Sequence, residues 1–69
     1  MRPQLAVRYA ELAPDTLLTC AQVGDWLQLR PRQVQRLGVP FIDCGERNRR
    51  YLVRDVRAWI EARRRGAAA

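Results

Sequence analysis

The sequence predicts a mainly α-helical fold with a small β-hairpin, formed as one domain. Apolar residues recur at helical spacing in three segments, and two short extended runs flank a turn that contains glycine and asparagine. The 69 residues are enough for a single core. A core this small needs large side chains, and the candidates are Tyr9, Trp26, Phe41, Tyr51 and Trp59.

Residues 1–17 are expected to form an N-terminal arm that packs on the domain. Leu5, Tyr9 and Leu12 have the spacing of a short amphipathic helix, whereas Leu5, Val7 and Tyr9 alternate as in a strand. The pattern leaves both structures open. Residues 18–65 are expected to form the domain itself, and residues 66–69 a disordered tail.

Local signals predict a first helix from residue 20 to about residue 28. Thr19 is a good N-cap and Gln22 follows three residues later, a combination that predicts a capping box. Gly24 lies in the middle of this helix, where glycine costs about 1 kcal/mol relative to alanine. A residue without a side chain at this position predicts that another helix crosses closely there.

A second helix is predicted over residues 31–37. Pro31 suits a first helical position because its missing N–H is harmless there, and Gly38 predicts a left-handed stop. With Gly24 at the crossing and Val34 as the inward-facing anchor, the two helices have the spacing of a helix-turn-helix. The second helix of such a unit projects its outer face into a DNA major groove.

A hairpin and a third helix complete the expected fold. The strands are predicted over residues 41–44 and 49–52, with a turn over residues 45–48. The last helix is predicted over residues 53–64, because Val56, Trp59 and Ile60 recur on one face.

The charge balance predicts an anionic partner. The chain has 13 basic residues, all of them arginine, against 7 acidic residues, which gives a net charge of +6 and a pI near 11.0. Nucleic acid is the first candidate and a membrane surface the second. The charge alone does not show whether the arginines bind nucleic acid or only keep a small domain soluble.

The composition argues against an enzyme, a cofactor and a metal site. The chain has no histidine and no serine, which removes Ser-His-Asp triads and histidine-based metal sites. The acidic residues show no paired arrangement, and no phosphate-binding loop is present.

The cysteines and the hydropathy pattern predict a cytoplasmic protein without a membrane partner. Cys20 and Cys44 are expected to be reduced, semi-buried thiols rather than a disulfide. No signal-peptide pattern follows the start, and no segment approaches the ~18 apolar residues of a membrane span.

Ten residues are candidates for DNA contacts because of their type and expected position. Arginine can bind guanine O6 and N7 bidentately, and glutamine can do the same with adenine N6 and N7. On the second helix these are Arg32, Gln33, Gln35 and Arg36, with Arg36 and Arg32 as the first candidates for base contacts. On the hairpin, Arg47, Asn48, Arg49 and Arg50 would follow phosphates or enter a minor groove, and Arg30 and Arg54 could clamp the DNA backbone.

Several of these residues lie in a pattern that covers about two-thirds of the chain. It comprises Leu17-Leu18-Thr19, Val23, Leu27, Arg32, Val34, Arg36-Leu37, the turn from Gly45 to Arg50, and Asp55-Val56-Arg57-Ala58-Trp59-Ile60. The pattern resembles the winged helix-turn-helix of phage excisionases and AlpA-type regulators, which is related to the DNA-binding head of MerR proteins. The family usually has glycine where this chain has Gln28, and a longer segment where it has Gly38-Val39-Pro40.

The resemblance implies an architectural DNA-binding protein without catalytic residues. It would be an excisionase, or recombination directionality factor, that binds adjacent sites cooperatively and bends double-stranded DNA to promote integrase-mediated excision. The implied partners are DNA, a phage integrase and neighbouring copies of the chain. An AlpA-like transcription regulator on the same fold is the alternative, and the DNA-recognition part of a packaging terminase is a third variant. From another class, a protein-interaction module remains open.

Overall fold

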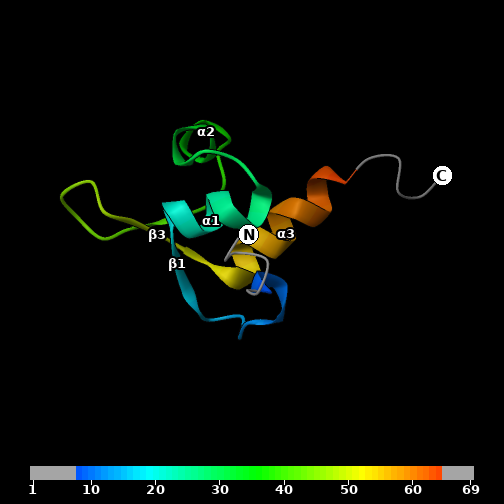
Figure 1. Ribbon diagram of the computed structural model, residues 1–69. Coiled ribbons are helices and arrows are strands. Elements are labelled where there is room, and N and C mark those ends of the chain that lie inside the picture. The colour runs from blue at the N-terminus through cyan, green and yellow to red at the C-terminus, as the bar shows by residue number, and fades with distance from the viewer. Residues whose placement is uncertain (1–7, 65–69) are drawn as a thin grey trace, which may run out of the picture.

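The structure is a computed structural model that describes residues 8–64 of the chain. The expected tail at residues 66–69 and the positions of Leu5 and Val7 lie outside the described residues. Within the described part, three α-helices and a three-stranded antiparallel sheet form a small compact α/β domain (Figure 1). The elements in chain order are the 3-10 helix η2 (Tyr9–Glu11), β1 (Leu17–Thr19), α1 (Cys20–Leu27), α2 (Pro31–Arg36), β2 (Ile42–Asp43), β3 (Arg49–Leu52) and α3 (Val53–Arg63).

The sheet has the strand order β1-β3-β2, so the second strand of the hairpin lies at its centre. β2 pairs with β3 with Asp43 opposite Arg49, which confirms the predicted hairpin. β1 pairs with the other edge of β3, with Leu18 opposite Tyr51. This third strand corrects the expectation of a hairpin alone. A strand of three residues is too short to show an alternating pattern, and its partner is distant in sequence.

The three α-helices confirm the predicted ones to within one or two residues at each end. At the start of α1, Gln22 donates its backbone N–H to Oγ1 of Thr19 at 3.1 Å, and Thr19 donates its own N–H to Oε1 of Gln22 at 2.8 Å. These two bonds form the predicted capping box. After α2, Gly38 takes a φ of +77°, the left-handed stop that the sequence predicts.

The core lies between the helices and one face of the sheet. Its buried members are Tyr9, Leu18, Val23, Val34, Val39, Tyr51, Val53 and Val56. Trp26 and Trp59 are half-buried against this cluster. Phe41 is 43% exposed, so its prediction as a core anchor is wrong. The reason is its position beside β2, both residues of which are exposed.

The segment before the sheet packs on the core, in a conformation that the sequence did not resolve. Tyr9 belongs to the 3-10 helix η2 rather than to an α-helix or a strand, and its ring is stacked on Trp26 with centroids 5.8 Å apart. Further along, Val53 donates its N–H to the carbonyl oxygen of Thr16 at 3.0 Å. Of the two free thiols, Cys20 is half-buried as expected, but Cys44 is exposed.

Candidate nucleic-acid interface

Helices α1 and α2 are joined by a turn that folds back onto α1 at Gly24. A Cβ atom on Gly24 would lie 2.5 Å from the carbonyl oxygen of Leu29 and 3.5 Å from the backbone nitrogen of Pro31. Leu29 also donates its N–H to the carbonyl oxygen of Gly24 at 2.7 Å. The predicted close approach at Gly24 is confirmed, and its nearest partner is the turn backbone that leads into α2.

Gln28 gives the turn its direction by adopting a left-handed conformation, with φ 60° and ψ 45°. A non-glycine residue in this region costs about 1–2 kcal/mol, because Cβ approaches a backbone carbonyl oxygen. Gln28 caps α1, and its backbone N–H reaches the carbonyl oxygens of Asp25 and Gly24. The chain therefore makes the tight turn with glutamine at the position where the resembled family usually has glycine.

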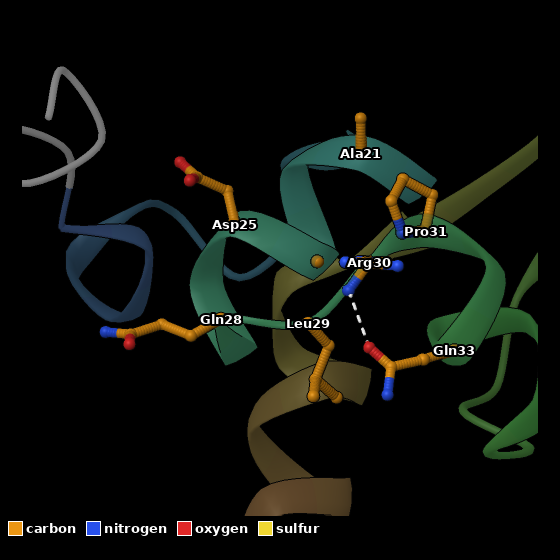
Figure 2. A pocket seen from close by; sticks show the side chains of 8 residues that line it. Ala21, Asp25, Gln28, Leu29, Arg30, Pro31 and Gln33 are labelled. Atoms are coloured by element: carbon orange, nitrogen blue, oxygen red, sulfur yellow. Dashed lines mark hydrogen bonds between the residues drawn. The ribbon is translucent and has the colours of Figure 1, made fainter.

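An open hollow of about 520 Å³ lies between α1, the turn and the first turn of α2 (Figure 2). It is lined by Ala21, Gly24, Asp25, Gln28, Leu29, Arg30, Pro31 and Gln33. At its edge, Arg30 donates its backbone N–H to Oε1 of Gln33 at 3.0 Å, the bond dashed in Figure 2. A bidentate contact to adenine needs both the oxygen and the nitrogen of a glutamine side chain. The oxygen of Gln33 already accepts one hydrogen bond at the start of α2, which fixes the position of the side chain there.

The outer surface of α2 carries the other three residues predicted on this helix. Arg32, Gln35 and Arg36 are all exposed. Their spacing of three and four residues places them on one side of the helix, while Val34 is 1% exposed and faces the core. The structure thus brings two arginines and one glutamine together on a solvent-facing helix surface.

The hairpin loop presents Arg47 and Asn48 at its tip, where both are exposed. The loop is closed by Asn48, which donates its N–H to the carbonyl oxygen of Gly45 at 2.7 Å. Glu46 and Arg47 both take positive φ, 48° and 67°. Positive φ at both central positions is typical of the tight turns that match strand twist, and glycine or asparagine usually fills them. The loop therefore holds Arg47 in a conformation that is unusual for arginine.

Arg49 and Arg50 lie on opposite faces of the sheet, because consecutive residues of a strand alternate. Arg50 is opposite Thr19 and Ile42 on the outer face, and its Nη1 donates to the carbonyl oxygen of Arg49 at 2.9 Å. Arg49 shares the inner face with Tyr51. The four polar residues of the hairpin therefore do not form one continuous surface.

Burial raises the pKa of the Tyr51 hydroxyl beneath Arg49, and the nearby Cys20 thiol raises it further, while the Arg49 guanidinium opposes the increase. Cys20 donates from Sγ to the carbonyl oxygen of Pro31 at 3.2 Å, which links this part of the sheet to α2. The Tyr51 hydroxyl thus lies between the Arg49 guanidinium and Cys20, the first residue of α1.

Arg30 and Arg54, the two residues expected to clamp the DNA backbone, lie in different parts of the domain. Arg30 is exposed at the N-cap of α2. Arg54 is at the start of α3, at the end of β3 away from the hairpin loop, and its Nη1 lies 3.1 Å from Oδ1 of Asp15. The structure therefore places Arg30 beside the α2 residues and Arg54 apart from the hairpin residues.

Many of the arginines lie on α2 and the hairpin, away from the C-terminal end of α3 (Figure 1), while α3 carries Arg54, Arg57 and Arg63. Residues 30–50 contain six arginines against Asp43 and Glu46. In the described part of the chain, the ion pairs are Arg8–Glu11, Arg54–Asp15 and Arg64–Glu61, none of which lies on α2 or the hairpin. The carboxylate of Asp43 accepts a hydrogen bond from the backbone N–H of Gly45 at 2.9 Å.

Sequence reasoning missed Phe41 as a possible member of this surface. Its ring lies under the guanidinium of Arg49, with Cζ 4.1 Å from the ring centroid. The hairpin register would have identified it. Asp43 is opposite Arg49, and Phe41 lies two residues before Asp43, so Phe41 and Arg49 are on the same face of the sheet. The turn residues alone do not determine that register.

Two further structural observations concern residues 8–64 only. These residues contain no cluster of three histidine, cysteine, aspartate or glutamate side chains that could hold a metal ion. Nor does any helix among them combine the length and the apolar character that crossing a bilayer requires.

Comparison of the chain with family models, with curated proteins and with solved structures finds no match.

Proposed function

We propose that the chain is a sequence-specific DNA-binding protein of the winged helix-turn-helix type. In this proposal α2 enters a major groove and the hairpin forms the wing that contacts the neighbouring backbone or minor groove. The observation that carries the proposal is the concentration of unpaired arginines on α2 and the hairpin. Six arginines lie within residues 30–50, and none of them forms an ion pair with a described carboxylate. Elsewhere in the described part of the chain, Arg8, Arg54 and Arg64 are paired, while Arg57 and Arg63 on α3 are not.

The geometry of α1, the turn and α2 supports the same proposal. Gly24 lets the turn backbone approach α1, so that α2 leaves the domain with Val34 inward and Arg32 and Arg36 outward. Arginine on such a surface can form the bidentate guanine contact that gives base discrimination of about 1–3 kcal/mol per pair.

We further propose that the protein acts as an excisionase, or recombination directionality factor. A single domain of this size covers on the order of 600–1,000 Å² of DNA and contacts few base pairs. Neighbouring copies on adjacent sites, a bend in the DNA and a bound phage integrase would supply the missing specificity. These partners are taken from the resemblance of residues 17–64 to the excisionase family. Such a protein would work in the cytoplasm, where the phage or host DNA is found.

The test is footprinting of the purified protein across the DNA of its source genome at two salt concentrations. Protected tandem sites beside an integrase attachment site, lost at the higher salt, are the expected result. Sites over a promoter and away from any attachment site would replace the excisionase with a transcription regulator on the same fold. An absence of salt-sensitive protection, together with salt-insensitive binding to a protein, would overturn DNA binding in favour of an interaction module.

A further inference from the structure

Phe41 and Arg49 form a stacked pair on the surface of the hairpin. The guanidinium carbon of Arg49 lies 4.1 Å from the centroid of the Phe41 ring. Phe41 is 43% exposed, while Arg49 is half-buried. A large aromatic side chain at this exposure contributes little to the core, but its face offers a flat, electron-rich platform for a cation.

The pair is fixed in place from behind by the core. Tyr51 follows Arg49 by two residues on the same face of β3, and its ring lies 6.1 Å from that of Phe41 at an angle of 54°. Tyr51 is only 1% exposed, so its position is set by the packing around it. Phe41 and the half-buried Arg49 therefore both lie against the buried Tyr51, and the long, flexible arginine side chain has an aromatic support.

The guanidinium of Arg49 also lies close to the Tyr51 hydroxyl, whose pKa it lowers against the effect of burial. A guanidinium has five N–H donors, so Arg49 keeps further donors that can meet phosphate oxygens. Asp43 is directly opposite Arg49 in the sheet, but Oδ1 of Asp43 accepts from Gly45 at 2.9 Å. Within residues 8–64, no carboxylate forms an ion pair with Arg49.

The location of the pair indicates which part of DNA it would meet. Phe41 ends the short connection from α2 to β2, directly after the buried Val39 and the exposed Pro40. Arg49 begins β3, directly after the hairpin loop. The pair thus lies between the helix proposed for a major groove and the loop proposed for the adjacent backbone or minor groove. The sugar-phosphate strand separates these two grooves.

We propose that Phe41 is a positioning residue that holds Arg49 as a clamp for a backbone phosphate between α2 and the hairpin. This inference rests on the proposed DNA-binding function and adds to it the role of a residue that was expected in the core. It assigns Arg49 to affinity rather than to sequence discrimination, because phosphate contacts are the same for every sequence.

A mixed-sequence duplex of about 20 base pairs is therefore a suitable probe, since phosphate contacts need no specific site. Its affinity is measured over a series of salt concentrations for the wild type, Arg49→Ala, Phe41→Leu, Phe41→Tyr and the double variant Phe41→Leu/Arg49→Ala. Arg49→Ala is expected to weaken binding and to reduce the salt slope by about 1. Phe41→Leu is expected to weaken binding by about two- to five-fold, and Phe41→Tyr, which keeps the aromatic face, by less than that.

The double variant is the decisive measurement. If Phe41 acts only through Arg49, Phe41→Leu/Arg49→Ala binds as Arg49→Ala does. Ile42→Ala is the matched control, because Ile42 directly follows Phe41 and is 40% exposed but lies on the other face of the sheet, opposite Arg50. It is expected to leave the affinity unchanged. Thermal unfolding of each variant shows whether the fold is intact.

A spectroscopic measurement reports the stack without DNA. The ring current of Phe41 should shift the Arg49 Nε–H proton upfield, and this shift should be lost in Phe41→Leu and kept in Phe41→Tyr. Additive effects of the two substitutions on affinity, or an unchanged Arg49 resonance in Phe41→Leu, would overturn the clamp while DNA binding stands. A wild-type protein without salt-sensitive affinity for the duplex would overturn both the proposed function and the clamp.

Discussion

The hydroxyl of Tyr9 donates a hydrogen bond to Oδ2 of Asp25 at 2.9 Å and so joins the segment before the sheet to helix α1. The ring of Tyr9 is stacked on Trp26, and Tyr9 is 8% exposed. This contact buries an aromatic side chain that the sequence placed in an arm of undetermined structure. Part of the stability of the small core therefore comes from outside the helices and the hairpin.

Removing these contacts one at a time should lower the free energy of unfolding in two steps. Tyr9→Phe loses the hydrogen bond to Asp25 and should cost about 1 kcal/mol. Tyr9→Ala also loses the buried ring and should cost about 3–5 kcal/mol. Urea denaturation followed by tryptophan fluorescence measures both. Arg8→Ala is the control, because its pair with Glu11 is exposed and should contribute less than about 1 kcal/mol. Equal effects of Tyr9→Ala and Arg8→Ala would contradict the packing of this segment.

Stability should fall at alkaline pH because two tyrosines are buried. Burial raises the pKa of Tyr9 above its ordinary value of 10.0, and the hydrogen bond to Asp25 adds to the increase. Burial also raises the pKa of Tyr51. A group that holds its proton more tightly when folded contributes stability below its unfolded-state pKa and loses it as the pH rises through the folded-state pKa.

We therefore expect the free energy of unfolding to decline above about pH 10. Tyr9→Phe should show a shallower decline, since one of the two phenols is gone. Urea denaturation at a series of alkaline pH values, with a reductant present, measures the slope. A decline of equal steepness in wild type and variant would mean that Tyr9 is not involved.

Much of the fold could be predicted because its signals are local. The capping box of Thr19 and Gln22, and the stop at Gly38, are determined by residues within one turn of each other. The strand β1 could not be predicted, because its pairing with β3 joins distant residues through three positions only. The exposure of Phe41 follows from its position beside the exposed strand β2, and no local pattern contains that information.

The candidate site could be predicted as a set of residue types but not as a surface. Sequence spacing grouped Arg32 and Arg36, and the structure leaves both exposed on α2. Sequence spacing could not show that Gln33 accepts a hydrogen bond at the start of α2, or that Arg54 pairs with Asp15. Such side-chain partners depend on the tertiary position of the backbone. Whether any of these residues contacts DNA stays a prediction.

Replacing Gln28 with glycine should stabilise the protein. Gln28 has a φ of 60°, and glycine removes a strain of about 1–2 kcal/mol, which exceeds the added entropy of the unfolded chain of about 0.5–1 kcal/mol. A net gain of up to about 1.5 kcal/mol in the free energy of unfolding follows. Gln35→Gly is the matched control, because Gln35 lies in regular helix α2 and the same change should cost about 1 kcal/mol there. Chemical denaturation that shows the same sign for both variants would contradict the strained turn.

Gly24→Ala should disturb the turn between α1 and α2. The added methyl group would lie 2.5 Å from the carbonyl oxygen of Leu29, a backbone atom that cannot rotate away. Overpacking of this kind costs about 1–3 kcal/mol, and the shift of α2 should also weaken DNA binding. Gly45→Ala is the comparison, since its Cβ would meet nothing within 4 Å and only the φ of +88° opposes it. Thermal unfolding and duplex binding of both variants are the measurements. An undisturbed Gly24→Ala protein would show that the turn does not depend on this contact.

Replacing an arginine with alanine should weaken DNA binding more on α2 than on α3, although each replacement removes one positive charge. Arg36 and Arg57 are both exposed, Arg36 at the end of α2 and Arg57 on α3. Each alanine variant removes one positive charge, so the long-range attraction to DNA falls by a similar, salt-screened amount. Arg36→Ala additionally loses a proposed base contact, and binding to a footprinted site should weaken by about 1–3 kcal/mol. Titration of both variants against that site and against a mixed-sequence duplex separates the two contributions. If Arg57→Ala weakens specific binding as much as Arg36→Ala does, α2 is not the helix that contacts the bases, and net charge alone accounts for the affinity.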